Sequence, residues 1–509
     1  MKKLIFALLF TFACTAIFAI AYTAKWNEEW EKLTEEEQWF CLLSEPLTER
    51  NALSIISVNP EPFVPEGKQS HSQGILENSW QCFSKEELIA TAEEFWNGEE
   101  KVIAEYNFLK SKVAGLQASP ASKVTAAIEK LAAEEILDFS SIARLYYIVE
   151  MQDILGENGL LAWNYGKLLA GLRWGIGAGW LTEAEALDLA KPFIDFLLNA
   201  FDSWEDYAVH YAFGRAYYAL QYGLNYTKYF NEALEDVRLY DIEVEEDEKD
   251  KIFTFHGIKF PGLNVNGNRI LTYSDAVYKP SKEAELWMLT VRQTRHPGDV
   301  TDLEYASYLN FLKKKKHLPR VAYNLVQMQR DNEWTKTNAQ IDSLPKPLSD
   351  ADLEKRNRLV SNTYKKDLKF YDEANASFKK ADKYNPLYIQ FYMEYAVTSF
   401  QAGDYKKYCS LFTDVLSGFE EEIQQTADIK NFTCLYYLTL AEREMKARNY
   451  EDCYKYVVKA LDYLNDAKTA FSMDFLKTEQ MGAIRSALFD MLKDCEDNLA
   501  KENRRRQTE

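Results

Sequence analysis

The chain has 509 residues, enough by length for two or three domains and for a sizeable buried core. Its 60 basic and 79 acidic residues give a net charge of −19, which argues against nucleic acid or an anionic membrane surface as the main partner. Hydrophobic residues make up 47% and aromatic residues 14%, so the composition excludes an intrinsically disordered chain. With 20 Gly and 13 Pro, collagen-like and low-complexity classes are excluded, and long helices are expected.

Residues 1–24 have the pattern of an export signal, because two lysines precede an apolar run over residues 4–24. Three outcomes stay open: cleavage after Ala21, retention of the run as a membrane tether, and lipidation at Cys14. In each case the positive end stays inside, so the rest of the chain is expected in the periplasm or at the outer face of the cytoplasmic membrane.

Six cysteines follow the export signal, and an oxidising compartment permits disulfides among them: Cys41, Cys82, Cys409, Cys434, Cys453 and Cys495. We would test the pair Cys41–Cys82 first. The alternative is that most of these cysteines are small buried apolar residues. No C-x-x-C motif occurs, so the sequence predicts neither a zinc knuckle nor a thioredoxin-type site, and no cofactor or metal is expected.

Residues 35–222 predict an all-α module. Its clearest signal lies in residues 160–190, where apolar residues recur every three or four positions. Gly166 and Gly171 carry no side chain and allow a neighbouring helix to approach closely. Three hydroxyl residues, each followed three positions later by an acidic residue, predict helix starts: Ser84, Thr182 and Ser203.

Four strings in this module resemble one uncharacterised bacterial family: LTERN (47–51), SKEEL…EEFW (84–96), LLAWNYGKLLAGLRWGIGAGWLTEAEA (160–186) and FDSWEDYAVHYAFGRAYY (201–218). The family is the one catalogued as domain of unknown function twelve sixty-six. The resemblance implies a helical domain and brings no established activity. Asn164 and Lys167 stand where the family pattern has Asp and Arg, so acid chemistry at that Asp position is not expected here.

Five residues of these motifs are candidates for a binding pocket: Trp163, Arg173, Trp174, Trp204 and Arg215. In the functional interpretation, the two arginines hold a carboxylate or phosphate and the tryptophans line the pocket. In the structural interpretation, the tryptophans belong to the core and the arginines are stacked or paired with an acid such as Glu183 or Glu205.

Residues 226–300 differ in composition from the helical segments around them. An acidic run occupies residues 241–250, and Asn266-Gly267 lies between β-rich stretches, which is a hairpin signal. We therefore expect a linker with a small β hairpin that joins two helical halves.

Residues 301–500 predict a helical repeat. Ala374, Phe378, Ala381 and Pro386 have the spacing of the second helix of a tetratricopeptide repeat, and the spacing recurs at Tyr408, Phe412 and Val415 and again at Cys453, Val457 and Ala460. A turn is expected before each second helix, at Phe370-Tyr371, Gly403–Tyr405 and Asn449-Tyr450. The pattern resembles the tetratricopeptide family over about 355–465, and each helix pair must bury its apolar face against the next.

The tetratricopeptide resemblance implies a concave groove lined by first helices, in which a peptide or a partner helix would lie. The residues of this groove would include Met393, Val397 and Phe400, followed by Leu438, Glu442 and Met445. The alternative is that Phe400 and Leu438 belong to the core between repeats.

The sequence favours an exported, non-catalytic scaffold that binds a protein or peptide in the cell envelope. It contains no G-x-S-x-G, Walker or zinc motif. The alternative is an enzyme of unknown reaction with an anion-binding site built on Arg173 and Arg215. A weaker option is a structural protein of the envelope, tethered through residues 4–24.

Overall fold

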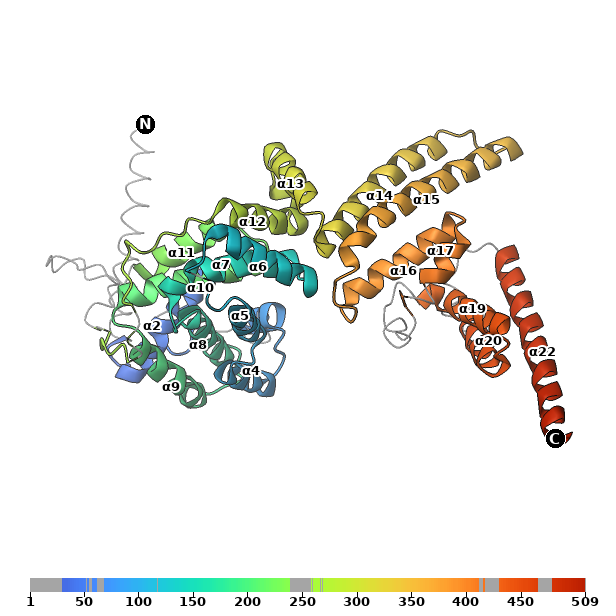
Figure 1. Ribbon diagram of the computed structural model, residues 1–509. Helices are drawn as coiled ribbons and strands as arrows, with labels where there is room; N and C mark the ends of the chain where they lie inside the picture. The colour runs from blue at the N-terminus through green and yellow to red at the C-terminus, as the bar shows by residue number, and fades with distance from the viewer. Residues whose placement is uncertain are drawn as a thin grey trace, which may run out of the picture. The chain divides into compact units, whose positions relative to one another are not determined.

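The computed structural model describes residues 30–51, 53–54, 57–61, 68–116, 118–238, 258, 260–265, 267, 269–411, 415–416, 430–465 and 478–508. The expected export signal and the acidic run at 241–250 lie outside these residues. The chain divides into two compact units, Met1–Ile128 with Phe139–Tyr308, and Glu129–Asp138 with Leu309–Glu509. The described residues form helices and no strand, which confirms the predicted all-α fold (Figure 1).

The first unit contains α2 (Glu35–Arg50), α3 (His71–Ile75), the π-helix η1 (Leu76–Trp80), α4 (Lys85–Asn97), α5 (Lys101–Lys112), α7 (Phe139–Leu155), α8 (Leu161–Gly177), α9 (Glu183–Ala200), α10 (Trp204–Gln221), α11 (Tyr226–Arg238), α12 (Lys282–Arg295) and the short 3₁₀-helix η3 (Pro297–Asp299). The second contains α14 (Pro319–Asp342), α15 (Asp350–Phe378), α16 (Pro386–Gln401), α17 (Tyr405–Ser410), α19 (Lys430–Ala447), α20 (Tyr450–Asn465) and α22 (Thr478–Thr508). Of the three boundaries between the units, one falls within α6 (Ala121–Glu134), one directly before α7 and one within α13 (Asp302–Lys314).

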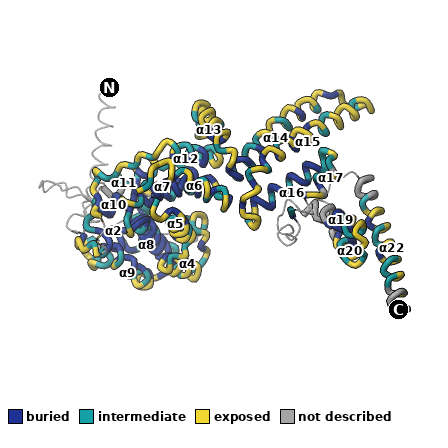
Figure 2. The backbone as a smooth tube through the Cα atoms, viewed as in Figure 1, coloured by how far each residue is buried: buried dark blue, intermediate teal, exposed yellow. Residues whose placement is uncertain are grey.

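Helix α8 is the centre of the first unit. Nearly all of its side chains are buried, and it packs against α2, α4, α9 and α10 (Figure 2). A helix that is apolar on every side must be covered on every side. Its glycines make this packing close: a Cβ at Gly166 would meet the Tyr207 hydroxyl at 2.8 Å, and one at Gly171 would meet the Trp80 ring at 2.6 Å. The predicted close approach at both glycines is confirmed.

The predicted helix starts are also confirmed. Thr182 and Glu185 form a complete capping box at α9, and Ser203 accepts a hydrogen bond from the Asp206 backbone N–H at the start of α10. Ser84 caps α4 by accepting from the Glu87 backbone N–H. The Glu87 carboxylate accepts from the Phe83 backbone N–H at 2.6 Å instead of completing the box.

The expected β hairpin is not formed in the described part of residues 226–300. The β-rich stretch begins at residues 252–257, which lie outside the described residues, and the described part of 258–281 has no strand. Its backbone groups bond to α10 instead of to a partner strand. The Trp204 indole donates to the Ile258 carbonyl at 3.0 Å, and the Leu271 backbone N–H donates to Asp206 at 2.8 Å. A hairpin needs those groups for cross-strand pairing, so this packing replaces it.

The second unit is a solenoid-like series of helices with one continuous apolar core. Neighbouring helices pack in the pairs α14–α15, α15–α16, α16–α17, α19–α20 and α20–α22. Seven of the described positions that carried the repeat pattern are buried in this core: Ala374, Phe378, Ala381, Tyr408, Cys453, Val457 and Ala460. Val415 is half-buried and Pro386 is exposed, and Phe412 lies outside the described residues. The predicted burial of these helix faces against one another is therefore confirmed for the seven buried positions.

One of the three predicted turns is wrong. Phe370 and Tyr371 lie inside α15, a single helix of 29 residues. No glycine or proline interrupts this stretch, and Tyr371 is wholly buried with its hydroxyl donating to Glu394 at 2.7 Å. The turns at Gly403–Tyr405 and Asn449-Tyr450 precede α17 and α20 as expected.

The Cys41–Cys82 disulfide is not formed, because both thiols are free and buried, as are those of Cys453 and Cys495. Burial raises the pKa of the Cys41 thiol to about 11. These four cysteines fit the alternative of small buried apolar residues. Among the described helices, none combines the length and apolarity that crossing a bilayer requires.

Candidate functional site

Arg173 on α8 is wholly buried, and protein oxygen atoms surround its guanidinium. The group donates to the Ser54 carbonyl at 2.7 Å, the Ser57 carbonyl at 2.5 Å and the Ser44 hydroxyl at 2.9 Å. A longer contact of 3.4 Å reaches the Val58 carbonyl. The arginine thus joins α8 to α2 and to the segment that follows α2. Neither Glu183 nor Glu205 provides these contacts.

Two of the candidate tryptophans pack among other aromatic rings. Trp174 is wholly buried and meets Trp80 edge-to-face, with ring centroids 5.9 Å apart. Trp204 stacks on Trp39 at 5.5 Å and contacts Phe260 at 4.7 Å. Such pairs contribute to core packing. A ligand-binding role for either tryptophan stays a prediction.

Trp163 and Arg215 lie together, one on α8 and one on α10. The Arg215 guanidinium is 5.7 Å from the Trp163 ring and 5.1 Å from the Tyr229 ring. A Cβ at Gly214 would lie 2.4 Å from the Trp163 Cβ, so this glycine permits the approach. Arg215 therefore lies within cation–π distance of two rings, and a ligand-binding role for Trp163 or Arg215 stays a prediction.

Glu232 on α11 carries the negative charge opposite this group. Its carboxylate is 3.6 Å from Arg215, 3.0 Å from Arg50 and 3.8 Å from Lys228. Three cations thus share one carboxylate at the edge of the first unit. Arg173 is not part of this cluster, so the structure does not bring the two candidate arginines together through a shared partner among the described residues.

Lys167 is a feature that sequence reasoning noted only as a departure from the family pattern. Its ammonium is 5.0 Å from the Trp80 ring, 5.4 Å from Tyr218 and 5.7 Å from Phe95. Desolvation by this burial lowers the pKa of Lys167. Its position could have indicated this contact with aromatic rings, because Lys167 follows Trp163 by four residues on a mostly apolar helix.

The three groove candidates on α16 differ in exposure. Met393 is wholly buried in the core of the second unit, whereas Val397 and Phe400 are half-buried. Phe400 contacts Tyr408, with ring centroids 5.3 Å apart. Val397 and Phe400 are thus the two with accessible surface, and a role for any of the three in binding stays a prediction.

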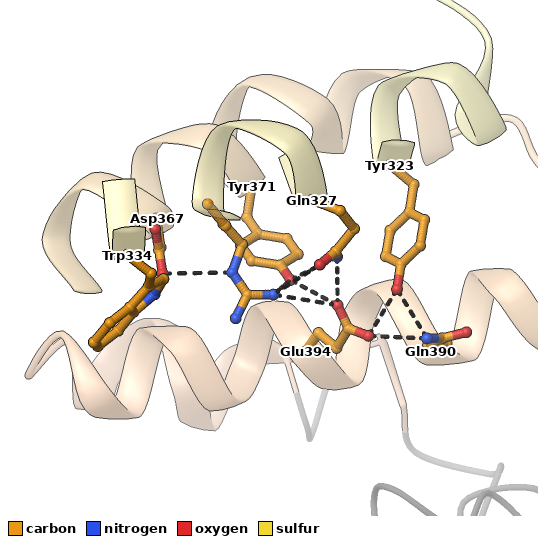
Figure 3. Close-up of polar contacts among 8 residues, drawn as sticks. Tyr323, Gln327, Trp334, Asp367, Tyr371, Gln390 and Glu394 are labelled. Atoms are coloured by element: carbon orange, nitrogen blue, oxygen red, sulfur yellow. Dashed lines mark hydrogen bonds and ion pairs between the residues drawn. The ribbon is translucent and has the colours of Figure 1, made fainter. Parts of the chain in front are cut away.

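A polar network connects α14, α15 and α16 in the second unit (Figure 3). The Glu394 carboxylate accepts hydrogen bonds from Tyr323 at 2.8 Å, Gln390 at 2.9 Å, Gln327 at 2.9 Å and Tyr371 at 2.7 Å. Burial, reinforced by this carboxylate, holds the pKa of the Tyr371 hydroxyl well above its usual range. The hydroxyl therefore remains a donor at all physiological pH values.

Arg330 extends the network to a second carboxylate. It donates to the Tyr371 hydroxyl at 2.8 Å and to Asp367 at 3.4 Å, and it lies 3.7 Å from Glu394. The Trp334 indole donates to the same oxygen of Asp367 at 2.8 Å. Burial raises the pKa of Asp367, although the Trp334 hydrogen bond and the Arg330 charge oppose the shift.

The sequence contained a signal for this network that the repeat pattern concealed. Tyr323, Gln327, Arg330 and Trp334 recur every three or four residues and form one stripe along α14. Because the stripe is polar and aromatic, it does not match the apolar template used to find helix faces.

No group of three or more His, Cys, Asp and Glu residues in the described part of the chain could hold a metal ion.

Comparison with known proteins supports the family resemblance of the motifs within residues 75–240, whereas the LTERN motif (47–51) lies outside the match. The model of a family described as "Protein of unknown function (DUF1266)" matches residues 75–240. An uncharacterized protein of Escherichia coli (strain K12), YbeR, is 29% identical over 72 residues. That match covers 14% of this chain and 31% of YbeR, so the chain spans about a third of the relative's length. No solved structure matches the chain.

Proposed function

We propose that the protein is an exported, non-catalytic scaffold that binds a protein or peptide in the cell envelope through its C-terminal unit. The proposal includes a tetratricopeptide-like organisation of the helix pairs α16–α17 and α19–α20, in which the first helix of each pair faces the partner. Each of these pairs has its turn at the position that the repeat pattern requires.

The observation that carries the proposal is the partial exposure of apolar residues on the two first helices. Val397 and Phe400 on α16 and Leu438 and Met445 on α19 are half-buried, while the signature positions beside them are buried. Phe400, Leu438 and Met445 also pack against the core of the second unit, and the partner would cover the apolar surface that stays accessible.

The network around Glu394 supports the same function by joining α16, one of the two helices that would carry the partner, to α14 and α15. Tyr323, Tyr371 and Arg330 join three helices through one carboxylate. Hydrogen-bonded polar networks between helices favour one arrangement of those helices. A preformed surface loses less conformational entropy when a partner binds.

Export is supported by the sequence pattern of residues 1–24. A fusion of residues 1–30 to a reporter phosphatase that is active only outside the cytoplasm tests it directly. We expect phosphatase activity from this fusion. We expect no activity from a variant in which Lys2 and Lys3 are replaced by Glu and the apolar run over residues 4–24 is shortened by half. Equal activity without residues 1–24 would contradict export.

Affinity capture with the full chain tests the scaffold function. We expect the wild-type chain to retain a specific envelope protein that the double variant Val397→Gln/Leu438→Gln does not retain. Tyr454→Gln on α20 is the matched control, because Tyr454 is 36% exposed on a second helix and should leave capture unchanged. Melting curves of all three chains verify folding. Identical capture by the three chains would reject the proposed surface.

The enzyme alternative receives less support from the geometry. An anion site at Arg173 would need donors directed at a ligand, and those of Arg173 are directed at the oxygens of Ser44, Ser54 and Ser57.

A further inference from the structure

A pocket of about 530 Å³ lies between α4 and α9 in the first unit, and no motif considered above predicted it. Both helices place residues four apart on it, Ala92 and Trp96 from α4 and Asp188 and Pro192 from α9. Leu189 and Phe193 complete its apolar wall. The pocket belongs to the N-terminal unit and is independent of the surface on α16 and α19.

The aromatic wall of the pocket includes one exposed indole. Trp96 is 52% exposed, and it is the one tryptophan in the described ranges that is exposed rather than buried or half-buried. Its ring packs against Phe193 in an edge-to-face arrangement, with centroids 5.4 Å apart. An exposed indole ring attracts cations and the apolar stems attached to them.

The acidic groups of the pocket carry uncompensated charge. Glu93 and Asp188 line the pocket and are exposed, and no cation among the described residues forms an ion pair with either. Nearby Lys191 is directed at Glu36, at 2.9 Å, and Asp195, at 3.5 Å. Two unpaired carboxylates beside an indole face favour a cationic group over a neutral or anionic one.

Pro192 leaves one backbone carbonyl of α9 without its usual hydrogen-bond donor. It lies inside α9 and has no backbone N–H, so the Asp188 carbonyl does not receive the usual hydrogen bond from the residue four positions later. Asp188 and Pro192 both line the pocket. The pocket therefore combines two carboxylates with an apolar wall, at a turn of α9 where one carbonyl lacks its usual backbone donor.

We propose that this pocket binds a lysine or arginine side chain of a partner peptide. The ammonium or guanidinium donates hydrogen bonds to Glu93 and Asp188, while the aliphatic stem lies along Trp96 and Pro192. A peptide fits better than a free small amine because the pocket is open and exposed at Trp96, Glu93 and Pro192, so that flanking residues of a chain can cover the indole.

Fluorine NMR of the full chain labelled with 5-fluorotryptophan tests the proposal. The Trp96 signal is assigned with Trp96→Phe, and three probes are titrated: acetyl-Gly-Lys-Gly-amide, the same peptide with norleucine in place of lysine, and butylammonium chloride. We expect the lysine peptide to shift the Trp96 signal in a saturable way. We expect this peptide to bind with a lower dissociation constant than butylammonium. The norleucine peptide has the same stem without the charge and should produce no saturable shift.

The variant Glu93→Gln/Asp188→Asn should bind the lysine peptide about tenfold more weakly than the wild-type chain does. The matched control is Glu235→Gln/Asp302→Asn, which removes two exposed acids outside the pocket and should leave binding unchanged. Any of four results overturns the proposal: no saturable shift, equal binding of the norleucine peptide, tighter binding of butylammonium than of the peptide, or unchanged binding in Glu93→Gln/Asp188→Asn. Loss of the C-terminal surface by Val397→Gln/Leu438→Gln should not alter this binding, so the two proposals fail separately.

Discussion

Arg173 demonstrates how a buried charge serves a fold without an acidic partner in its hydrogen-bond shell. Its donors satisfy carbonyls of a segment with no regular structure of its own, at Ser54 and Ser57, and a hydroxyl on α2. Buried carbonyls that lose their donors cost more than the hydrogen bonds contributed. The arginine is thus expected to matter for stability.

Arg173→Met retains much of the side-chain volume and removes every donor. We expect the free energy of unfolding to fall by about 3 kcal/mol or more, because two carbonyls and a hydroxyl lose their partner. Urea denaturation measures the change. Lys191→Met, which removes exposed ion pairs with Glu36 and Asp195, is the control and should leave the urea midpoint almost unchanged. A wild-type midpoint in Arg173→Met would mean that the arginine is not structural.

Glu394→Gln tests the network of the second unit. The substitution replaces one acceptor oxygen by an amide that donates, although two hydroxyls and two amides donate to this position. We expect a loss of about 2 kcal/mol in the free energy of unfolding. Glu442→Gln, at an exposed position on α19, should change it by less than about 0.5 kcal/mol. Equal free energies of unfolding for the two variants would show that the network does not stabilise the fold.

Helix α9 begins with a complete capping box, and the electrostatics of this box predict a measurable titration. Hydrogen bonds from Lys85 and from the Thr182 backbone and hydroxyl lower the pKa of Glu185 from its ordinary value of 4.5 to about 2. Because the folded-state pKa lies below the unfolded one, the stabilisation is present above about pH 4.5 and is lost as the pH falls toward 2.

Carbon-13 NMR of the Glu185 carboxyl should therefore show an inflection near pH 2. In Lys85→Met the largest contribution is removed, and the inflection should move toward 4.5. Lys191→Met lies on the same helix without contacting Glu185 and should leave the titration unchanged. An inflection near 4.5 in the wild-type chain would disprove the cap geometry.

The helices also show which elements could be predicted and which could not. The start of α9 at Thr182 and the close packing at Gly166 and Gly171 were predictable, because capping and small-residue packing depend on local residue types. The continuity of α15 through Phe370 and Tyr371 was not, because a repeat template placed a turn where no residue type requires one. The hairpin prediction failed because Trp204 and Asp206, which are distant in sequence, form hydrogen bonds with the backbone groups of Ile258 and Leu271.

The candidate site was predictable only in part for the same reason. The aromatic character around Trp163, Trp174 and Trp204 could be expected from composition and motif, but the partner of Arg215, Glu232, lies on the next helix in a position no motif marks. The pocket at Trp96 depends on the pairing of α4 with α9, which only the packed structure defines.

The division of the chain into two compact units predicts two unfolding transitions. Each unit has its own apolar core, so each should unfold cooperatively by itself. In calorimetry of the full chain, Arg173→Met should lower only one transition temperature and Glu394→Gln only the other. A single transition that both variants shift by similar amounts would contradict the division.

Site-specific photo-crosslinking tests the central claim, which is that a partner lies on the first helices of the C-terminal unit. A photoreactive phenylalanine analogue is placed at Phe400 or Leu438, and at Tyr454 on α20 as the control, in the full chain expressed at native level. The account predicts a discrete crosslinked product of one size from both Phe400 and Leu438 and none from Tyr454. Crosslinks from Tyr454 alone, or from no position, would contradict it.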